Sequence, residues 1–218
     1  MKILLCGVMY LFMAPLFAQS TLSTDSLYSP ALGKTERYQI YLPDGYTPNS
    51  NQRYPVIYFL HGALSDHEGY GFIKDVLDNL IASKRIKPMI VVKPNGNQGN
   101  YGGSMFANSP LYGKVEDFIV KDLVGHVDQK YRTVSSRSSR AVMGHSMGAD
   151  GAARYSILYP DVFCGFASHS GSLDLSFAQL FFAFVIQEQE QQKDSIPYEY
   201  TPLDGFATAA LFRVGGAA

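Results

Sequence analysis

The chain has no block of charge of one sign. Its 18 Lys and Arg and 19 Asp and Glu residues are mixed along 218 positions and give a formal net charge of -1. Because a nucleic-acid partner calls for a basic stripe or patch, this balance argues against one. An internal repeat of about 20 to 50 residues, the mark of solenoids and propellers, is also missing. With 46% hydrophobic and 17% charged residues, the composition is that of a globular domain with a sizeable core.

Cysteine is scarce, and one of the two lies in an N-terminal segment with the pattern of an export signal. Lys2 precedes an almost wholly apolar run from Ile3 to Phe17, and Ala18 is a small residue where a signal peptidase can cut. We therefore expect residues 1–18 to be a signal peptide and the protein to be exported, to the periplasm or beyond. Its removal leaves Cys164 as the remaining thiol, so no internal disulfide is expected.

A long apolar run is absent as well. The run in the signal segment is shorter than the roughly 20 residues that cross a bilayer, and a polar stretch follows it. We expect no stable membrane anchor after cleavage; a retained anchoring helix is the alternative. Residues 19–33 are interpreted as a polar leader, and residues 34–218 as the domain.

Within the domain, short apolar segments alternate with helical patterns. Residues 34–43 alternate as a half-buried strand does. Continuous apolar runs predict strands buried on both faces of a parallel sheet, at 54–60, 88–94, 140–144 and 162–169. Apolar residues at helical spacing predict helices at 72–81 and 115–131, and a third helical segment spans 149–158. This alternation predicts an α/β fold, with a mostly parallel sheet covered by helices on both faces.

The segment RAVMGHSMGADGAARY, residues 140–155, contains Ser146 between Gly144 and Gly148. It joins a predicted strand to a predicted helix. This is the setting of a nucleophile elbow, where serine occupies a strained turn and small neighbours let strand and helix approach closely. We predict that Ser146 is a catalytic nucleophile; an ordinary strand-to-helix turn is the alternative.

A second segment fits the same chemistry. His61, Gly62 and Ala63 directly follow the predicted strand 54–60, where a hydrolase of this architecture completes its oxyanion hole. The predicted donors are the backbone N–H groups of Ala63 and of Met147. We interpret His61 as a structural residue that hydrogen-bonds loop backbone.

The glycine-rich and asparagine-rich loop 95–109 follows a strand, at the sheet edge where α/β proteins bind ligands. Tyr101 and Ser104 are candidates for shaping an acyl or alcohol pocket; a flexible surface loop is the alternative. His67, His126 and His145 have no carboxylate or cysteine spaced as metal ligands. We predict no metal and no other cofactor.

Several motifs in order resemble one family. YLPDGYTPNSNQRYPVIYFLHG, KPNGNQGNYGG, EDFIVKDLVGHVDQKYRT and RAVMGHSMGADGAARYSILYPDVFCGFASHSGSLD are similar to an esterase family of the α/β-hydrolases that includes esterase D, feruloyl esterases and the antigen 85 mycolyltransferases. The resemblance covers Glu36 to Asp174. It implies the α/β-hydrolase fold and hydrolysis of a small-molecule or carbohydrate-linked ester, through an acyl-enzyme formed by a Ser, His and Asp triad.

The chain departs from this family after the nucleophile. In such hydrolases an Asp and then a His follow the serine on later loops, but the last histidine here is His169, close behind Ser146. We interpret the sequence as a truncated hydrolase that lacks its last strands and its general base, so its status as an enzyme is left open. Asp204 is a candidate triad acid or a surface turn, and His169 is a candidate substitute base.

Three functions therefore remain open. The first is an exported serine carboxylic ester hydrolase, impaired by loss of the triad Asp and His. The second is an acyltransferase that passes the same acyl group to an alcohol. The third is a non-catalytic remnant or binding module.

Overall fold

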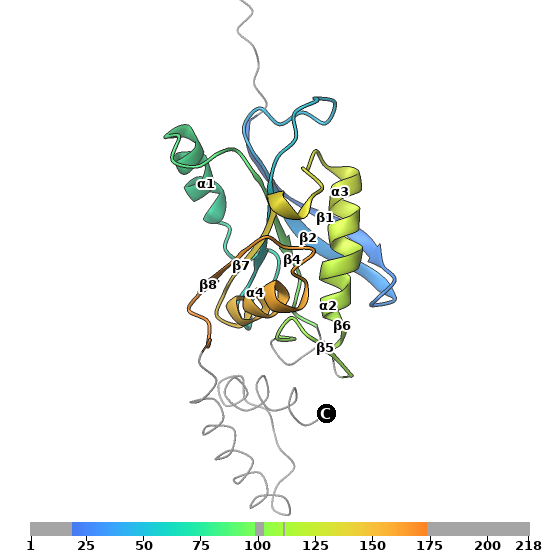
Figure 1. Cartoon of the computed structure of the whole chain (residues 1–218). Coiled ribbons are helices and arrows are strands. Elements are labelled where there is room, and N and C mark those ends of the chain that lie inside the picture. Colours follow the sequence, from blue (N-terminus) through green and yellow to red (C-terminus); the bar gives the residue numbers. More distant parts are fainter. Residues whose placement is uncertain (1–18, 99–102, 111, 174–218) are drawn as a thin grey trace, which may run out of the picture.

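The computed structural model describes residues 19–98, 103–110 and 112–173, and it contains a central six-stranded sheet, which Figure 1 shows between the helices. The strand order is β1-β2-β4-β3-β7-β8. Strands β4, β3, β7 and β8 are parallel neighbours, whereas β2 pairs antiparallel with both β1 and β4. The predicted α/β fold with a mostly parallel sheet is thus confirmed.

Strands β2, β3, β4 and β7 follow the predicted runs closely, whereas β1 was not predicted and β8 is shorter than predicted. Their bounds are β1 (Thr21–Ser29), β2 (Lys34–Leu42), β3 (Val56–Leu60), β4 (Ile90–Pro94), β7 (Arg140–His145) and β8 (Phe166–His169). A separate two-stranded ladder joins β5 (Asn108–Ser109) to β6 (Gly113–Lys114).

Helices cover both faces of the sheet. One face packs against α1 (Ile73–Ala82), through a cluster that includes Phe59, Leu77 and Val91. The opposite face packs against α4 (Met147–Leu158) and a continuous helix made of α2 (Val115–Asp117), a π-helical segment (Phe118–Leu123) and α3 (Val124–Lys130). A short 3-10 turn (Arg137–Ser139) leads into β7.

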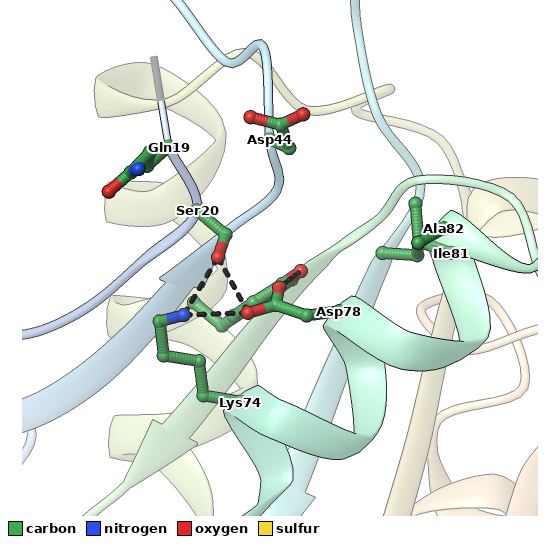
Figure 2. A pocket seen from close by; sticks show the side chains of 8 residues that line it. Gln19, Ser20, Asp44, Lys74, Asp78, Ile81 and Ala82 are labelled. Atoms are coloured by element: carbon green, nitrogen blue, oxygen red, sulfur yellow. Dashed lines mark hydrogen bonds and ion pairs between the residues drawn. The ribbon is translucent and has the colours of Figure 1, made fainter. Parts of the chain in front are cut away.

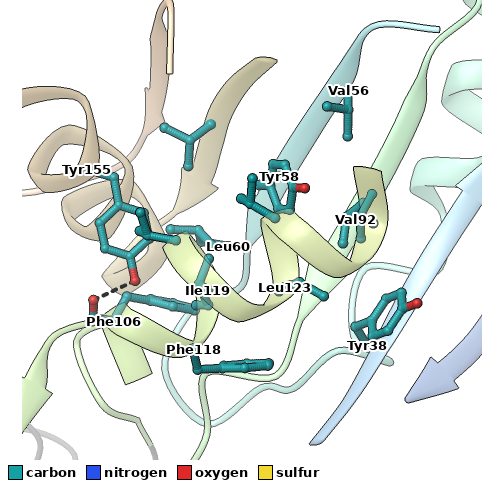
Figure 3. Close-up of a cluster of buried hydrophobic side chains, with 14 of the residues drawn as sticks. Tyr38, Val56, Tyr58, Leu60, Val92, Phe106, Phe118, Ile119, Leu123 and Tyr155 are labelled. Atoms are coloured by element: carbon teal, nitrogen blue, oxygen red, sulfur yellow. Dashed lines mark hydrogen bonds between the residues drawn. The ribbon is translucent and has the colours of Figure 1, made fainter. Parts of the chain in front are cut away.

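The larger core lies under α3 and α4 (Figure 3). Tyr58 and Leu60 of β3 point toward Ile119 and Tyr155 of the covering helices, and all four side chains are almost fully buried. Each such side chain contributes roughly 1.5–3 kcal/mol through burial. The hydroxyl of Tyr155 donates to the carbonyl of Phe106 at 2.7 Å, so the loop after β4 is fixed to α4, the helix that begins beside Ser146.

Residues 19–33 are not a polar leader outside the domain, because Thr21–Ser29 forms the first strand of the sheet. Asp25 accepts hydrogen bonds from Tyr38 at 2.9 Å and from Tyr131, and it pairs with Lys130 at 2.6 Å. These contacts tie β1 to β2 and to the end of α3. The strand is polar because it is an edge strand that exposes most of its side chains, and its sequence therefore lacks the apolar signal of the inner strands.

The last predicted strand is shorter than expected. Only Phe166–His169 of residues 162–169 pairs with β7. The preceding residues form a turn in which the N–H groups of Val162 and Phe163 donate to Tyr159 O. The Phe163 side chain is 2% exposed and lies in the core, so this residue serves packing, and backbone bonding to β7 begins at Cys164, whose N–H donates to Arg140 O at 2.9 Å.

Residues 174–218, where the sequence predicts the loss of later strands, lie outside the described part of the chain, as does the predicted signal peptide 1–18. Among the residues that are described, no helix has the length and apolar character needed to cross a membrane.

Candidate functional site

Ser146 occupies a strained turn at the carboxyl end of β7. Its backbone has φ 51° and ψ -120°. Residues other than glycine rarely adopt a positive φ. Its N–H donates to His169 O at 2.9 Å, and its carbonyl accepts the N–H of Ala149 at 2.8 Å in the first turn of α4. The predicted sharp strand-to-helix turn at Ser146 is therefore present.

The two glycines of this turn have no room for a side chain. A Cβ atom on Gly144 would overlap the backbone of Gly148, and one on Gly148 would overlap the carbonyls of Leu60 and His61. The turn thus brings β7, β3 and the start of α4 into direct backbone contact. This close approach is the physical reason for glycine at both positions.

The two predicted oxyanion donors follow neighbouring parallel strands. Leu60 of β3 pairs with Gly144 of β7. Ala63 follows Leu60, and Met147 follows Gly144, by the same number of residues. Gly103 lies against both, since a Cβ atom on it would overlap Met147 Sδ and lie 3.8 Å from Ala63 Cα. Met147 is the first residue of α4, where backbone N–H groups have no acceptor within the helix and the helix dipole favours negative charge.

His61 holds the loop that carries Ala63. The residue is 1% exposed; its Nε2 accepts the N–H of Gly96 at 2.9 Å, and its Nδ1 lies 2.7 Å from Gly62 O. Because Nε2 is an acceptor, the neutral ring carries its proton on Nδ1, which donates to Gly62 O. The predicted structural role of His61 is confirmed.

The buried imidazole of His61 makes stability depend on pH. Burial lowers the pKa of His61 from 6.5 to about 4, although the bond to Gly62 O opposes this shift. Between about pH 6.5 and pH 4, the His61 imidazole therefore binds a proton in the unfolded chain but stays neutral in the folded chain. We expect the contribution of His61, about 3 kcal/mol, to be intact above pH 6.5 and to be lost progressively down to about pH 4.

Urea unfolding across this range measures the effect. Burial also lowers the pKa values of His67 and His126. These two residues therefore also lower the free energy of unfolding as the pH falls. The variant His61→Asn retains an amide that can donate to Gly62 O but does not titrate, so its free energy of unfolding should fall less steeply with acid. An identical slope in the variant and the unmodified protein would refute this role of His61.

Two further histidines lie beside the nucleophile. His145 and His169 occupy paired positions on β7 and β8, with ring centroids 5.4 Å apart. The His169 ring is exposed, and its Nδ1 lies 3.4 Å from Ser170 Oγ. Within the described residues no side chain hydrogen-bonds to Ser146 Oγ. The backbone of His169 therefore supports the turn, while its imidazole is not engaged with the nucleophile.

Tyr70 is a residue of this site that sequence reasoning missed. Its hydroxyl lies 2.7 Å from His145 Nδ1 and accepts the N–H of Gly62 at 3.3 Å. The residue belongs to the connection between β3 and α1, away from both motifs in the sequence, and no local pattern marks it. Its contacts arise only when the ends of β3 and β7 are brought together in the sheet.

The other predicted site residues divide into two groups. Ser104 is fully buried, and its hydroxyl donates to Gly96 O at 2.6 Å and accepts the N–H of Phe106 at 3.2 Å. Contrary to expectation, the Ser104 side chain therefore does not line a substrate pocket. Its hydroxyl instead links the backbone of Gly96 to that of Phe106 within the loop. Tyr101 and Asp204 lie outside the described residues. In the described part of the chain no group of three or more His, Cys, Asp or Glu residues could hold a metal ion.

A pocket of about 430 Å³ lies at the other end of the sheet (Figure 2). It is bordered by the start of β1, the end of β2 and helix α1. Because β2 runs antiparallel to β4, this is the edge opposite Ser146. Lys74 pairs with Asp78 at 2.6 Å and donates to Ser20 at 2.9 Å, and Tyr41 donates to Asp78 at 2.7 Å. These polar groups satisfy one another, and no predicted site residue lies among them.

Comparisons with known proteins agree with this geometry. Residues 29–204 match the family model described as "Putative esterase". Esterase Rv1288 of Mycobacterium tuberculosis is 31% identical over 145 residues, which are 66% of this chain and 31% of that protein. The "Endo-1,4-beta-xylanase/feruloyl esterase" of Xylanibacter ruminicola is 30% identical over 146 residues, 63% of this chain and 20% of its own length.

A solved structure described as a ferulic acid esterase is 33% identical, with a TM-score of 0.66. The match covers 71% of this chain and 61% of that structure. The chain therefore spans a minor part of the two curated relatives and less than two thirds of this solved esterase.

Proposed function

Because this chain belongs to the esterase family of carboxylic ester hydrolases, as its motifs predicted, we propose that Ser146 is the nucleophile of its ester chemistry. The observation that carries the proposal is the backbone of Ser146, strained at φ 51° between two glycines that cannot bear a side chain. Such strain persists where the surrounding structure imposes it, and it marks functional positions.

The proposed reaction has two acyl-transfer steps. Ser146 Oγ attacks the ester carbonyl carbon as its proton passes to a base, and the carbonyl oxygen becomes an oxyanion. The N–H groups of Ala63 and Met147 stabilise that negative charge. Collapse expels the alcohol, which takes up the proton, and leaves an acyl-enzyme on Ser146. A water molecule then attacks the acyl carbon and releases the carboxylic acid.

The site has no identified general base among the described residues. No imidazole among the described residues reaches Ser146 Oγ, and an unassisted serine hydroxyl is a poor nucleophile at neutral pH. Loss of a triad member still leaves roughly 10³- to 10⁴-fold catalysis over water, through the oxyanion hole and substrate binding. We propose that the chain turns over esters slowly.

Hydroxycinnamate esters are the first substrates to test. Two of the proteins that this chain resembles are described as feruloyl or ferulic acid esterases, and an aromatic acid linked to a carbohydrate fits the predicted class of substrate. An acyltransferase would form the same acyl-enzyme but deliver the acyl group to an alcohol.

Product analysis separates these functions. The protein is incubated with methyl ferulate in the presence and absence of a carbohydrate acceptor, and the products are separated by chromatography. We expect free ferulic acid to be the main product in both cases, formed slowly but above the rate without protein. Transfer to the carbohydrate as the main product would instead identify an acyltransferase. Binding of the ester without release of acid would identify a non-catalytic module.

A further inference from the structure

We propose that Tyr70 is a positioning residue whose hydroxyl group fixes the oxyanion loop and the nucleophile turn relative to each other. This inference rests on the proposed function, because it assigns a role to Tyr70 in the same site. It adds a residue to that site which lies in neither of its sequence motifs.

The contacts of the Tyr70 hydroxyl join the two halves of the site. The hydroxyl oxygen accepts the N–H of Gly62 at 3.3 Å and lies 2.7 Å from His145 Nδ1. Gly62 immediately precedes the oxyanion donor Ala63, and His145 immediately precedes Ser146. One hydroxyl group therefore contacts both the residue before the oxyanion donor and the residue before the nucleophile.

The hydrogen-bond roles follow from counting donors. A tyrosine hydroxyl has one proton to donate and can accept further bonds. Since Gly62 N–H donates to the oxygen, the hydroxyl proton is left for His145 Nδ1, which then accepts. This assigns His145 the tautomer with its proton on Nε2. Both contacts of Tyr70 are satisfied in this arrangement.

Tyr70 and His61 together fix the orientation of Gly62. His61 Nδ1–H donates to Gly62 O, and that carbonyl belongs to the same peptide unit as the Ala63 N–H. In a planar trans peptide the N–H points away from the carbonyl, so holding the carbonyl also sets the direction of the Ala63 N–H. Tyr70 holds Gly62 at its other side. With Gly62 anchored at both its N–H and its carbonyl, the Ala63 donor is preorganised.

The backbone of Tyr70 lies in the left-handed region, where the surrounding structure has to hold it. Its φ is 62°, a value that is uncommon for a bulky residue. Its ring is held by Phe59, His145 and Phe72, at centroid distances of 5.1, 5.6 and 6.0 Å. These neighbours pack around the ring while its hydroxyl contacts both Gly62 and His145.

The first test is Tyr70→Phe, which removes the hydroxyl and keeps the ring. Small misplacements of catalytic groups lower the rate of the chemical step more than they lower substrate binding. We expect kcat for p-nitrophenyl acetate to fall about 10-fold, with KM changed by less than about 3-fold. Tyr28→Phe is the matched control, because Tyr28 is 64% exposed on β1, and it should leave both constants unchanged. An unchanged kcat in Tyr70→Phe would overturn the proposal.

Variants of His145 test the coupling from the other side. His145→Asn retains an acceptor near the position of Nδ1 and should keep most of the activity, whereas His145→Leu should lower kcat as Tyr70→Phe does. The double variant Tyr70→Phe, His145→Leu should be no slower than the slower single variant, because both changes break the same link. Fully multiplicative losses would refute that link.

A spectroscopic measurement keeps the test independent of catalysis. The ¹⁵N resonances of the His145 ring should show unprotonated Nδ1 and protonated Nε2 in the unmodified protein, and a mixture of tautomers in Tyr70→Phe. The thermal unfolding temperature of each variant shows whether it is folded. If esters are not hydrolysed at all, the proposed function fails while the tautomer result still decides the role of Tyr70. The same tautomer in both proteins would contradict it.

Discussion

Replacing Ser146 with alanine should abolish formation of the acyl-enzyme and the turnover that passes through it. Ser146 lies in the strained turn between β7 and α4, and its neighbours in that turn carry no hydroxyl or thiol that could replace it. We expect the acylation burst with p-nitrophenyl acetate to be lost, whereas the steady-state kcat should fall by less than it would in an enzyme with an engaged base, because losses of triad members are not additive. Ser156→Ala is the matched control, since this serine of α4 donates to Ala153 O of its own helix, and its activity should be unchanged.

The unmodified protein should itself be slow, and His169 decides how that result is interpreted. A ferulic acid esterase with an intact triad, assayed beside it, should be faster by a factor of order 10² to 10⁴. We expect His169→Ala to change kcat by less than about 3-fold, since its ring is not engaged with Ser146. Fast turnover that both Ser146→Ala and His169→Ala abolish would show instead that these two residues form a catalytic dyad.

The second large effect concerns the fold around the turn. Gly148→Ala places a methyl group against the backbone carbonyls of Leu60 and His61, and backbone atoms in adjacent strands cannot move away without separating β3 from β7. Overpacking typically costs about 1–3 kcal/mol and more where the surroundings are rigid. We expect a loss above about 3 kcal/mol in the free energy of unfolding.

Urea unfolding of Gly148→Ala measures this loss, and a helical glycine with free space supplies the control. Gly125 lies in α3, and a methyl group added there would meet no heavy atom within 4 Å. Gly125→Ala should therefore stabilise the protein by about 0.5–1 kcal/mol. If Gly148→Ala were as stable as the unmodified protein, the close contact between the turn and β3 would be disproved.

The sequence predicts those parts of the molecule that local patterns determine. The inner strands are continuous apolar runs because both of their faces are covered, and the turn at Ser146 carries glycines because backbones meet there. The role of His61 was predictable too, because it directly follows a strand in a loop whose backbone needs partners. These features depend on residues that are neighbours in the chain.

Features that depend on distant contacts were not predictable in the same way. The sequence suggests a leader at β1 because this exposed edge strand has few apolar residues, and its place in the sheet is revealed by its pairing with β2 and by the contacts of Asp25. Ser104 was expected to face a ligand because it lies in a glycine-rich loop, yet its hydroxyl is turned inward to Gly96. Tyr70 gave no signal at all, because its partners are supplied by two other segments.

The most direct test of the nucleophile is to trap the acyl-enzyme. The protein is mixed with p-nitrophenyl acetate and quenched in acid, and its peptides are analysed by mass spectrometry beside those of Ser146→Ala. The slow turnover that we propose includes slow deacylation, which favours accumulation of the intermediate. We expect one acetyl group on the peptide that contains Ser146, and none on that peptide in the variant. A peptide that stays unmodified while the ester is hydrolysed, or equal acetylation in Ser146→Ala, would contradict the assignment of Ser146 as the nucleophile.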